Sequence, residues 1–130
     1  MEYKYSDITS RLINAAMEVH GIPGNGFQEV IYQRAYEIEL GQMKSLTVVR
    51  EFEMSINYKG QIIGTRRVDF LINNLISIEI KAVIKLEDVH LAQALNYLEA
   101  YNLEVGLLIN FGAKSLEFKR LYNKKYKPIT

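Results

Sequence analysis

The spacing of apolar residues along the first forty positions predicts two helices separated by a turn. The first helix is expected from a stripe at helical spacing, formed by Ile8, Leu12, Ala15, Ala16 and Val19. The glycine-rich segment GIPGNG at 21–26 must interrupt it. The second helix is expected to end at Gly41 and to bury the stripe of Phe27, Val30, Ile31, Ala35 and Ile38. Its opposite side carries Glu29, Tyr32 and Tyr36.

From residue 51 the pattern changes to a period of two, which predicts β-strands. Apolar and polar residues alternate in EFEMSINY at 51–58, which is typical of a half-buried strand, and Lys59-Gly60 is expected to turn the chain. A second strand is predicted around RRVDFLI at 66–72. Asn73-Asn74 marks another hairpin, because asparagine tolerates positive φ, and a third strand is expected at 75–82.

The last third of the chain predicts one more helix and two more strands. The helix is expected to begin at Asp88 and to bury Leu91, Ala94, Leu95 and Leu98. The run at 105–109 is apolar without alternation, which predicts a central strand, and residues 116–120 suggest a last strand at the edge. No repeat or linker divides residues 1–130, so we expect a single domain of α/β (α+β) class with the order α-α-β-β-β-α-β-β.

The composition matches an ordinary globular protein, since 48% of the 130 residues are hydrophobic and 24% are charged. These fractions exclude the disordered and fibrous classes. The absence of cysteine excludes a disulfide framework, a thiolate zinc site and a cysteine nucleophile. The polar start shows no signal peptide, and no apolar run approaches the ~20 residues of a membrane helix. We therefore expect an intracellular, cytoplasmic protein that does not enter a membrane.

Charge is unevenly distributed, although the net charge is only +1. Residues 114–130 carry six lysine and arginine residues against one glutamate. Such a segment is typical either of a solvated terminus or of an edge that contacts phosphates. The candidate nucleic-acid contacts are Arg66, Arg67, Lys119 and Arg120.

Three charged residues interrupt strands that otherwise look like interior sheet. Glu79 and Lys81 lie two apart in ISIEIKAVI and so project from one face, while Asp69 is a lone acid in RRVDFLI. If Asp69 and Glu79 oppose each other across the hairpin, their Cβ atoms lie about 4.5–5.5 Å apart. Such a pair suits one hard cation such as Mg²⁺, which polarises a phosphoryl oxygen and activates water, while Lys81 neutralises developing charge. The alternative is a structural ion pair between Lys81 and one of the acids.

The length of the hairpin loop decides whether this site can form. Two opposed residues with an even separation, such as Asp69 and Glu79, require a loop with an odd number of residues. A two-residue turn at Asn73-Asn74 would place Asp69 opposite Ile78 and would turn Glu79 to the other face. The site therefore predicts an odd loop, for instance Asn73 to Leu75, or a bulge.

Polar residues on two predicted helices are further candidates. His90, Gln93 and Tyr97 recur at i, i+3 and i+7 opposite an apolar stripe, where they can line a cleft over the sheet. The alternative is that His90 is solvated and Tyr97 packs at the rim. Glu29 lies near a helix N-terminus, where the helix dipole favours a solvated acid.

The segment at 26–32 reads GFQEVIY and matches the Gly-x-x-Glu-x-x-Tyr signature of the GxxExxY protein family. The likeness continues through EVH, YKG, RRVDFLI, IEIKAV, VHLAQALNYL and GLLINFG, so it spans nearly the whole chain. The family looks like a compact member of the PD-(D/E)xK nuclease superfamily, which implies a restriction-endonuclease-like core with a mixed sheet of about five strands flanked by helices. Val68 stands where the superfamily name has proline, and Gln28 stands where apolar residues are usual; neither is a proposed ligand.

The resemblance implies a role for each matching residue. Asp69 corresponds to the acid of the second core strand, and Glu79 and Lys81 correspond to the (D/E)xK pair. Glu29 resembles an extra acid of the first core helix, which would join Asp69 and Glu79 as a metal ligand. Gln93 resembles a helix glutamine that completes the catalytic set. The side chains expected to line the substrate cleft are Tyr32, Tyr36, His90 and Tyr97.

The expected function is a nuclease that hydrolyses phosphodiester bonds of DNA through a water activated by Mg²⁺ (or Mn²⁺). The alternative is a nuclease-fold module that binds nucleic acid or a protein partner and cleaves little or nothing. A metal-dependent hydrolase of a smaller phosphate ester is a third interpretation. The small size leaves no obvious room for a sequence-reading domain, so a protein partner or a homodimer would supply specificity.

Overall fold

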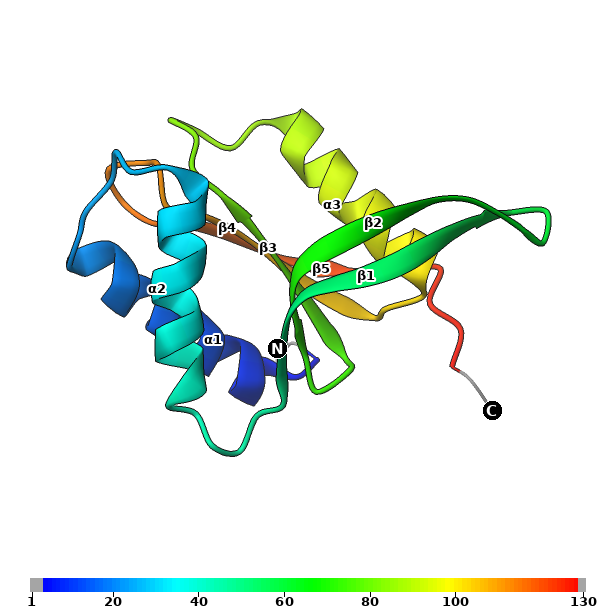
Figure 1. The fold of residues 1–130 in the computed structure, drawn as a ribbon, viewed down its shortest axis with the longest axis horizontal. Helices are drawn as coiled ribbons and strands as arrows, with labels where there is room; N and C mark the ends of the chain where they lie inside the picture. The colour runs from blue at the N-terminus through cyan, green and yellow to red at the C-terminus, as the bar shows by residue number, and fades with distance from the viewer. Residues whose placement is uncertain (1–3, 129–130) are drawn as a thin grey trace.

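A five-stranded mixed sheet forms the centre of the protein, and the computed structural model describes residues 4–128 (Figure 1). The strands lie side by side in chain order; β3 and β4 are parallel to each other, and the other neighbouring pairs are antiparallel. Their bounds are β1 (Val48–Tyr58), β2 (Gln61–Ile72), β3 (Ile76–Lys81), β4 (Val105–Asn110) and β5 (Glu117–Tyr122).

Helices cover both faces of this sheet. On one face lie α1 (Ser6–Gly21) and α2 (Glu29–Gly41), and on the other lies α3 (Asp88–Tyr101), which joins the two parallel strands (Figure 1). Parallel neighbours need a crossover of this kind, because a tight hairpin joins only antiparallel strands. The predicted α+β class and element order are therefore confirmed. Among the described residues no helix combines the length and the apolar character needed to cross a bilayer.

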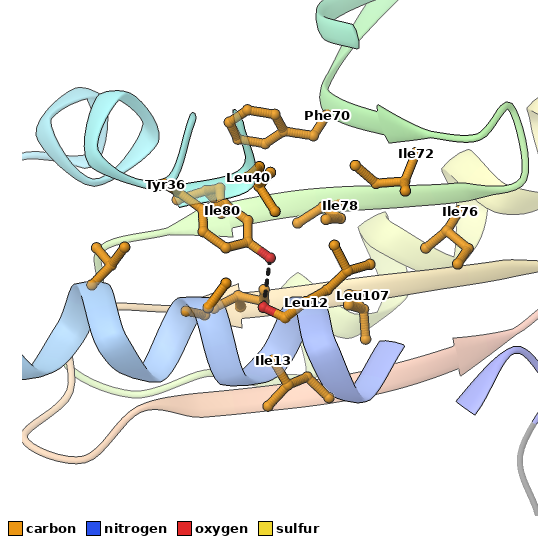
Figure 2. Close-up of a cluster of buried hydrophobic side chains, with 14 of the residues drawn as sticks. Leu12, Ile13, Tyr36, Leu40, Phe70, Ile72, Ile76, Ile78, Ile80 and Leu107 are labelled. Carbon is orange, nitrogen blue, oxygen red and sulfur yellow. Dashed lines mark hydrogen bonds between the residues drawn. The ribbon is translucent and has the colours of Figure 1, made fainter. Parts of the chain in front are cut away.

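The main core fills the space between the sheet and the pair α1–α2. Ile76, Ile78 and Ile80 of β3 point into it and are almost fully buried, as Figure 2 shows. The intervening residues of β3 therefore point to the α3 side, as the alternation predicts. Every residue of β4 is buried, which confirms the prediction of a central strand.

Helix α2 buries the opposite side from the one predicted. Ile31 and Ile38, assigned to the core stripe, are exposed, whereas Tyr32 and Tyr36 have no exposed surface. The prediction that Tyr32 and Tyr36 line a substrate cleft is therefore wrong. The Tyr36 hydroxyl donates a hydrogen bond to the Leu12 carbonyl at 2.8 Å (Figure 2), and the Tyr32 hydroxyl donates to a main-chain carbonyl near the start of the helix. A tyrosine whose hydroxyl has such a partner packs as a large apolar residue.

Strands β1 and β2 form a long hairpin that extends away from the rest of the sheet (Figure 1). The predicted turn at Lys59-Gly60 is confirmed, because Tyr58 pairs with Gln61 and both turn residues have positive φ. The prediction of a half-buried strand fails at Phe52 and Tyr58, which are exposed. Alternation alone cannot tell whether a hairpin has a partner on its apolar face.

The hairpin is distorted where it leaves the sheet. The β1–β2 ladder lacks the pair between Arg50–Phe70 and Phe52–Val68, where Glu51 has a left-handed φ of 55°. On the two sides of this point the buried side chains of β2 belong to different cores. Phe70 packs below α1 and α2, whereas Val68 packs beside α3. This switch of faces at Asp69 determines which side chains reach the candidate site.

Candidate active site

The β2–β3 hairpin brings Asp69 and Glu79 together. Ile72 pairs with Ile76 across a three-residue loop, so the odd loop required for the site is present. The ladder ends one pair before Asp69 and Glu79 would oppose each other in the same register. Beyond that point the Ile80 N–H donates a hydrogen bond to Asp69 Oδ2 at 2.7 Å. The Asp69 carboxylate thus supplies the acceptor for a strand amide at the place where β2 diverges from β3.

Glu79 is a buried acid whose charge is only partly compensated. Its side chain is about 6% exposed, and its Oε2 lies 3.5 Å from a terminal nitrogen of Arg66. Within the described chain, Glu79 Oε1 has no hydrogen-bond partner. Burial and the neighbouring Asp69 carboxylate raise the pKa of Glu79. Burial also raises the pKa of Asp69, against the lowering effect of its hydrogen bond from Ile80.

A small pocket lies between these strands and α3. It brings together some of the residues that the sequence predicted for the site. Glu79 and Lys81 of β3 face residues of α3 across it, whereas Asp69 does not line it. The predicted α3 residues that line it are His90, Gln93 and Tyr97. His90 also has a structural contact, because its Nδ1 accepts a hydrogen bond from the Glu87 N–H in the capping box of α3. Glu79 pairs with Arg66 rather than with Lys81 among residues 4–128, so the simple Lys81 ion pair is not what the structure contains.

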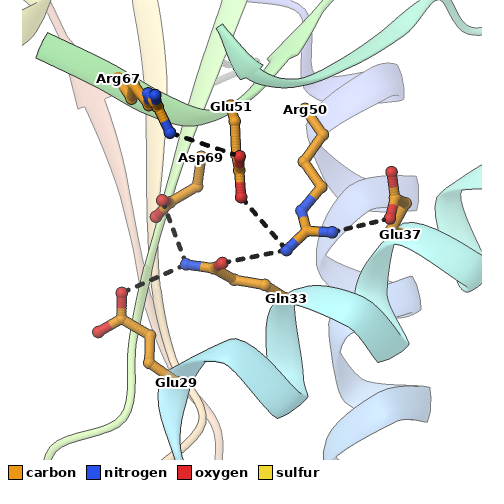
Figure 3. A network of polar contacts seen from close by, with 7 residues as sticks. All are labelled: Glu29, Gln33, Glu37, Arg50, Glu51, Arg67 and Asp69. Atoms are coloured by element: carbon orange, nitrogen blue, oxygen red, sulfur yellow. Dashed lines mark hydrogen bonds and ion pairs between the residues drawn. The ribbon is translucent and has the colours of Figure 1, made fainter.

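Glu29 reaches this region through an intermediary. Gln33, one turn further along α2, donates from Nε2 to Glu29 Oε1 at 3.3 Å and to Asp69 Oδ1 at 3.2 Å (Figure 3). Its Oε1 accepts from Arg50 at 3.4 Å, and Arg50 also pairs with Glu37 at 3.1 Å. Burial and then the charge of Asp69 raise the pKa of Glu29, although its side chain is largely exposed. Sequence reasoning missed Gln33, although its i+4 spacing from Glu29 is a usable signal.

The four candidate nucleic-acid contacts have different surroundings. Arg66 points into the pocket and lies over the Tyr97 ring, with its Cζ 4.1 Å from the ring centroid. Arg67 is two-thirds exposed and pairs with glutamates of β1 at 3.7 and 3.9 Å. Lys119 is exposed and pairs in the ladder with Leu108, which lines the pocket, so it lies on the pocket side of the sheet.

Arg120 does not belong to this surface. It opposes Leu107, a residue of the core below α1 and α2, so it points away from the α3 side. Its guanidinium donates hydrogen bonds to Thr9 and Ser10 of α1, each at 3.3 Å. Arg120 therefore does not lie beside the candidate site, and a contact of its side chain with nucleic acid elsewhere stays a prediction. Neighbouring strand residues point to opposite faces, so only one of Lys119 and Arg120 can serve the pocket.

The donor set suits one hard cation held by few protein ligands. Asp69 and Glu79 supply carboxylate oxygens, and the unpartnered Glu79 Oε1 is an acceptor that a cation would satisfy. No cluster of three or more histidine, cysteine or acidic residues with metal-binding geometry occurs in residues 4–128. Among the described residues Glu29 is joined to Asp69 through Gln33, and a role of Glu29 as a third direct ligand stays a prediction.

Comparison with known proteins identifies a family for this arrangement. A family model described as the PD-(D/E)XK nuclease superfamily matches residues 6–121. A crystal structure of a protein designated SSO0001 is similar to this chain, with a TM-score of 0.46 and 16% sequence identity over 89% of this chain and 77% of the other. The comparison with curated proteins found no match.

Proposed function

Because this chain belongs to the PD-(D/E)XK nuclease superfamily, we propose that it is a nuclease that hydrolyses phosphodiester bonds of DNA with the help of Mg²⁺ or Mn²⁺. Nucleases of this superfamily typically use divalent metal ions. The observation that carries the proposal is Glu79, a buried acid beside Asp69 whose Oε1 has no hydrogen-bond partner among residues 4–128. A buried carboxylate whose charge is only partly compensated is costly, so its retention beside a second acid favours a site for a cation.

Each residue of the site has a proposed task. Asp69 and Glu79 hold the cation, and the Ile80 N–H and the Gln33 amide fix the orientation of the Asp69 carboxylate. A bound Mg²⁺ supplies polarisation of the scissile phosphate and a lower pKa for the attacking water. Lys81 lines the same pocket and neutralises charge that develops on the phosphate.

Further side chains complete the proposed catalytic site. Gln93 positions the water or the phosphate from α3, and His90 and Tyr97 form the wall of the substrate cleft. Glu29 acts on the site through Gln33 and the Asp69 carboxylate. Arg67 and Lys119 remain candidate contacts to the DNA backbone, because both side chains are exposed.

A second candidate is a module that binds nucleic acid or a protein partner and cleaves little or nothing. The contact that favours it is the ion pair of Arg66 with Glu79, which already neutralises part of the charge that a cation would use. Membership of the GxxExxY branch, the single domain 1–130, a cytoplasmic location and a homodimer stay predictions.

The direct experiment is incubation of the pure protein with labelled single-stranded, double-stranded and branched DNA and with RNA. We expect cleavage of at least one DNA in Mg²⁺ or Mn²⁺, no cleavage in EDTA, and loss of cleavage in Asp69→Asn. Binding of DNA with a steep salt dependence, but without cleavage in either metal, would favour the binding module instead.

A further inference from the structure

Arg66 occupies an unusual position for an arginine of a protruding hairpin. Its guanidinium lies over the ring of Tyr97, with Cζ 4.1 Å from the centroid, and points toward Glu79. Tyr97 in turn stacks on Tyr101, with the two ring centroids 6.4 Å apart and the rings 20° from parallel. Arg66 reaches this place because β2 changes faces at Asp69. Helix α3 therefore provides an aromatic ring that holds the guanidinium at the pocket.

The contact between Arg66 and Glu79 is incomplete on both sides. Charge-assisted hydrogen bonds are usually about 2.7–2.9 Å long, and arginine usually binds a carboxylate through two of them. Here a single contact of 3.5 Å joins the two groups. Among the described residues, Glu79 Oε1 and Arg66 Nε are both buried without a hydrogen-bond partner. Within residues 4–128 the pocket thus contains one acceptor and one donor that have no hydrogen-bond partner.

Glu79 Oε1 can accept a cation and Arg66 Nε can donate to an anion, so the two groups suit a cation and an anion that bind at the same time. We propose that Arg66 is the phosphate-binding residue of the pocket and that Glu79 is its partner only in the resting protein, an assignment that rests on the proposed function. When a cation neutralises Glu79, Arg66 leaves the carboxylate and donates hydrogen bonds to a phosphodiester oxygen of DNA. Each charge keeps a counter-ion throughout this exchange. Tyr97 keeps the guanidinium in place while its partner changes.

The exchange makes a prediction that needs no metal. Glu79→Gln neutralises the carboxylate permanently, so Arg66 is free to bind phosphate even in EDTA. We expect Glu79→Gln to bind a short DNA duplex about tenfold more tightly than the wild type in EDTA at pH 8.5, where the Glu79 carboxylate of the wild type is charged. The gain should disappear in the double variant with Arg66→Gln, since it depends on the guanidinium. Arg66→Gln alone should change binding much less, because Arg66 of the resting protein is held by Glu79.

The experiment is a double-mutant cycle read by fluorescence anisotropy across a salt series. The matched control is Arg11→Gln in the Glu79→Gln background, because Arg11 lies on α1 at the opposite face of the sheet and contacts Ser45. The control should keep the increase in DNA affinity. In the double variant Glu79→Gln with Arg66→Gln, the logarithm of the binding constant should fall with the logarithm of salt concentration with a slope smaller by about one. Arg66→Met, which keeps the aliphatic stem over Tyr97, replaces Arg66→Gln if that variant does not fold.

The outcomes separate this assignment from the proposed function. A gain that persists in the double variant would be a general charge effect and would overturn the exchange, as would the absence of any gain. Mg²⁺-dependent cleavage without an Arg66-dependent gain overturns the exchange alone. If the increase in DNA affinity depends on Arg66 but the protein never cleaves DNA, the exchange is supported and the proposed nuclease activity is refuted. A protein whose variants bind no DNA at all overturns both.

Discussion

Replacing Glu79 by glutamine should stabilise the metal-free protein, although the residue lies at the centre of the proposed site. The carboxylate is buried next to Asp69, its Oε1 has no partner among the described residues, and its single contact with Arg66 is long. Glutamine keeps the shape and removes the charge. The Arg66 side chain is about 35% exposed, so water can solvate it when its partner is lost.

The magnitude follows from the cost of the unpartnered oxygen. A buried polar group without a hydrogen bond costs about 1–3 kcal/mol, and more when it is charged. A neutral amide is less costly to bury, which raises the stability of the variant. The loss of the weak ion pair with Arg66 lowers the stability by a smaller amount. We therefore expect Glu79→Gln to be about 1–2 kcal/mol more stable than the wild type near pH 8 in EDTA. For a chain of this length that is a rise in Tm of roughly 3–10 °C.

The effect should depend on pH with a definite sign. Because the folded-state pKa of Glu79 is raised, its contribution to stability is fully present below its unfolded pKa and is lost as pH rises through the folded value. The difference in Tm between variant and wild type should therefore be small near pH 5 and should grow toward pH 8.

Thermal unfolding followed by circular dichroism from pH 5 to pH 8, in EDTA and in Mn²⁺, measures this. Mn²⁺ should raise the Tm of the wild type and leave that of Glu79→Gln nearly unchanged, because only a protein that binds the cation is stabilised by it. A variant that is less stable than the wild type at every pH, with a parallel pH profile, would refute the reasoning. That result would mean that Arg66 fully compensates the Glu79 charge.

Three other substitutions test separate parts of the account. Glu29→Gln should reduce DNA cleavage sharply with little change in Tm; a loss of about 0.3–1 kcal/mol of stability with full activity would instead indicate a helix-dipole role. Gln33→Ala should weaken Mn²⁺ binding about tenfold in calorimetry, because the amide fixes the Asp69 carboxylate, whereas Gln28→Ala should not. Tyr36→Phe should lower the free energy of unfolding by about 1 kcal/mol in chemical denaturation and leave cleavage unchanged. Loss of cleavage with unchanged stability would instead support a role for Tyr36 in the site.

Local patterns in the sequence were sufficient to predict much of the fold and part of the site. The alternation in β3 placed Glu79 and Lys81 on one face. The even separation from Asp69 required an odd loop or a bulge, and the structure contains an odd loop of three residues. Such features follow from the period of a strand and from loop parity, which depend on neighbouring residues alone.

The failures involve information that is not local. Tyr36 was assigned to the cleft because it shares a helical side with Glu29, but its hydroxyl donates to the Leu12 carbonyl, 24 positions away. The pairing of Arg66 with Glu79 could not be expected, because it depends on the change of faces at Asp69 and on the left-handed backbone of Glu51. Arg120 and its neighbour Lys119 were assigned together from charge, although adjacent strand residues point to opposite faces.

The central claim is that the site formed by Asp69, Glu79 and Lys81 hydrolyses DNA, and Lys81→Ala tests it most directly. The measurement compares the rate of Mg²⁺-dependent cleavage with the affinity for the same DNA in the wild type and the variant. We predict that the rate falls by about 10²–10³, the effect of removing one preorganised electrostatic group, while the affinity for DNA changes little. Cleavage by Lys81→Ala at the wild-type rate would contradict the account.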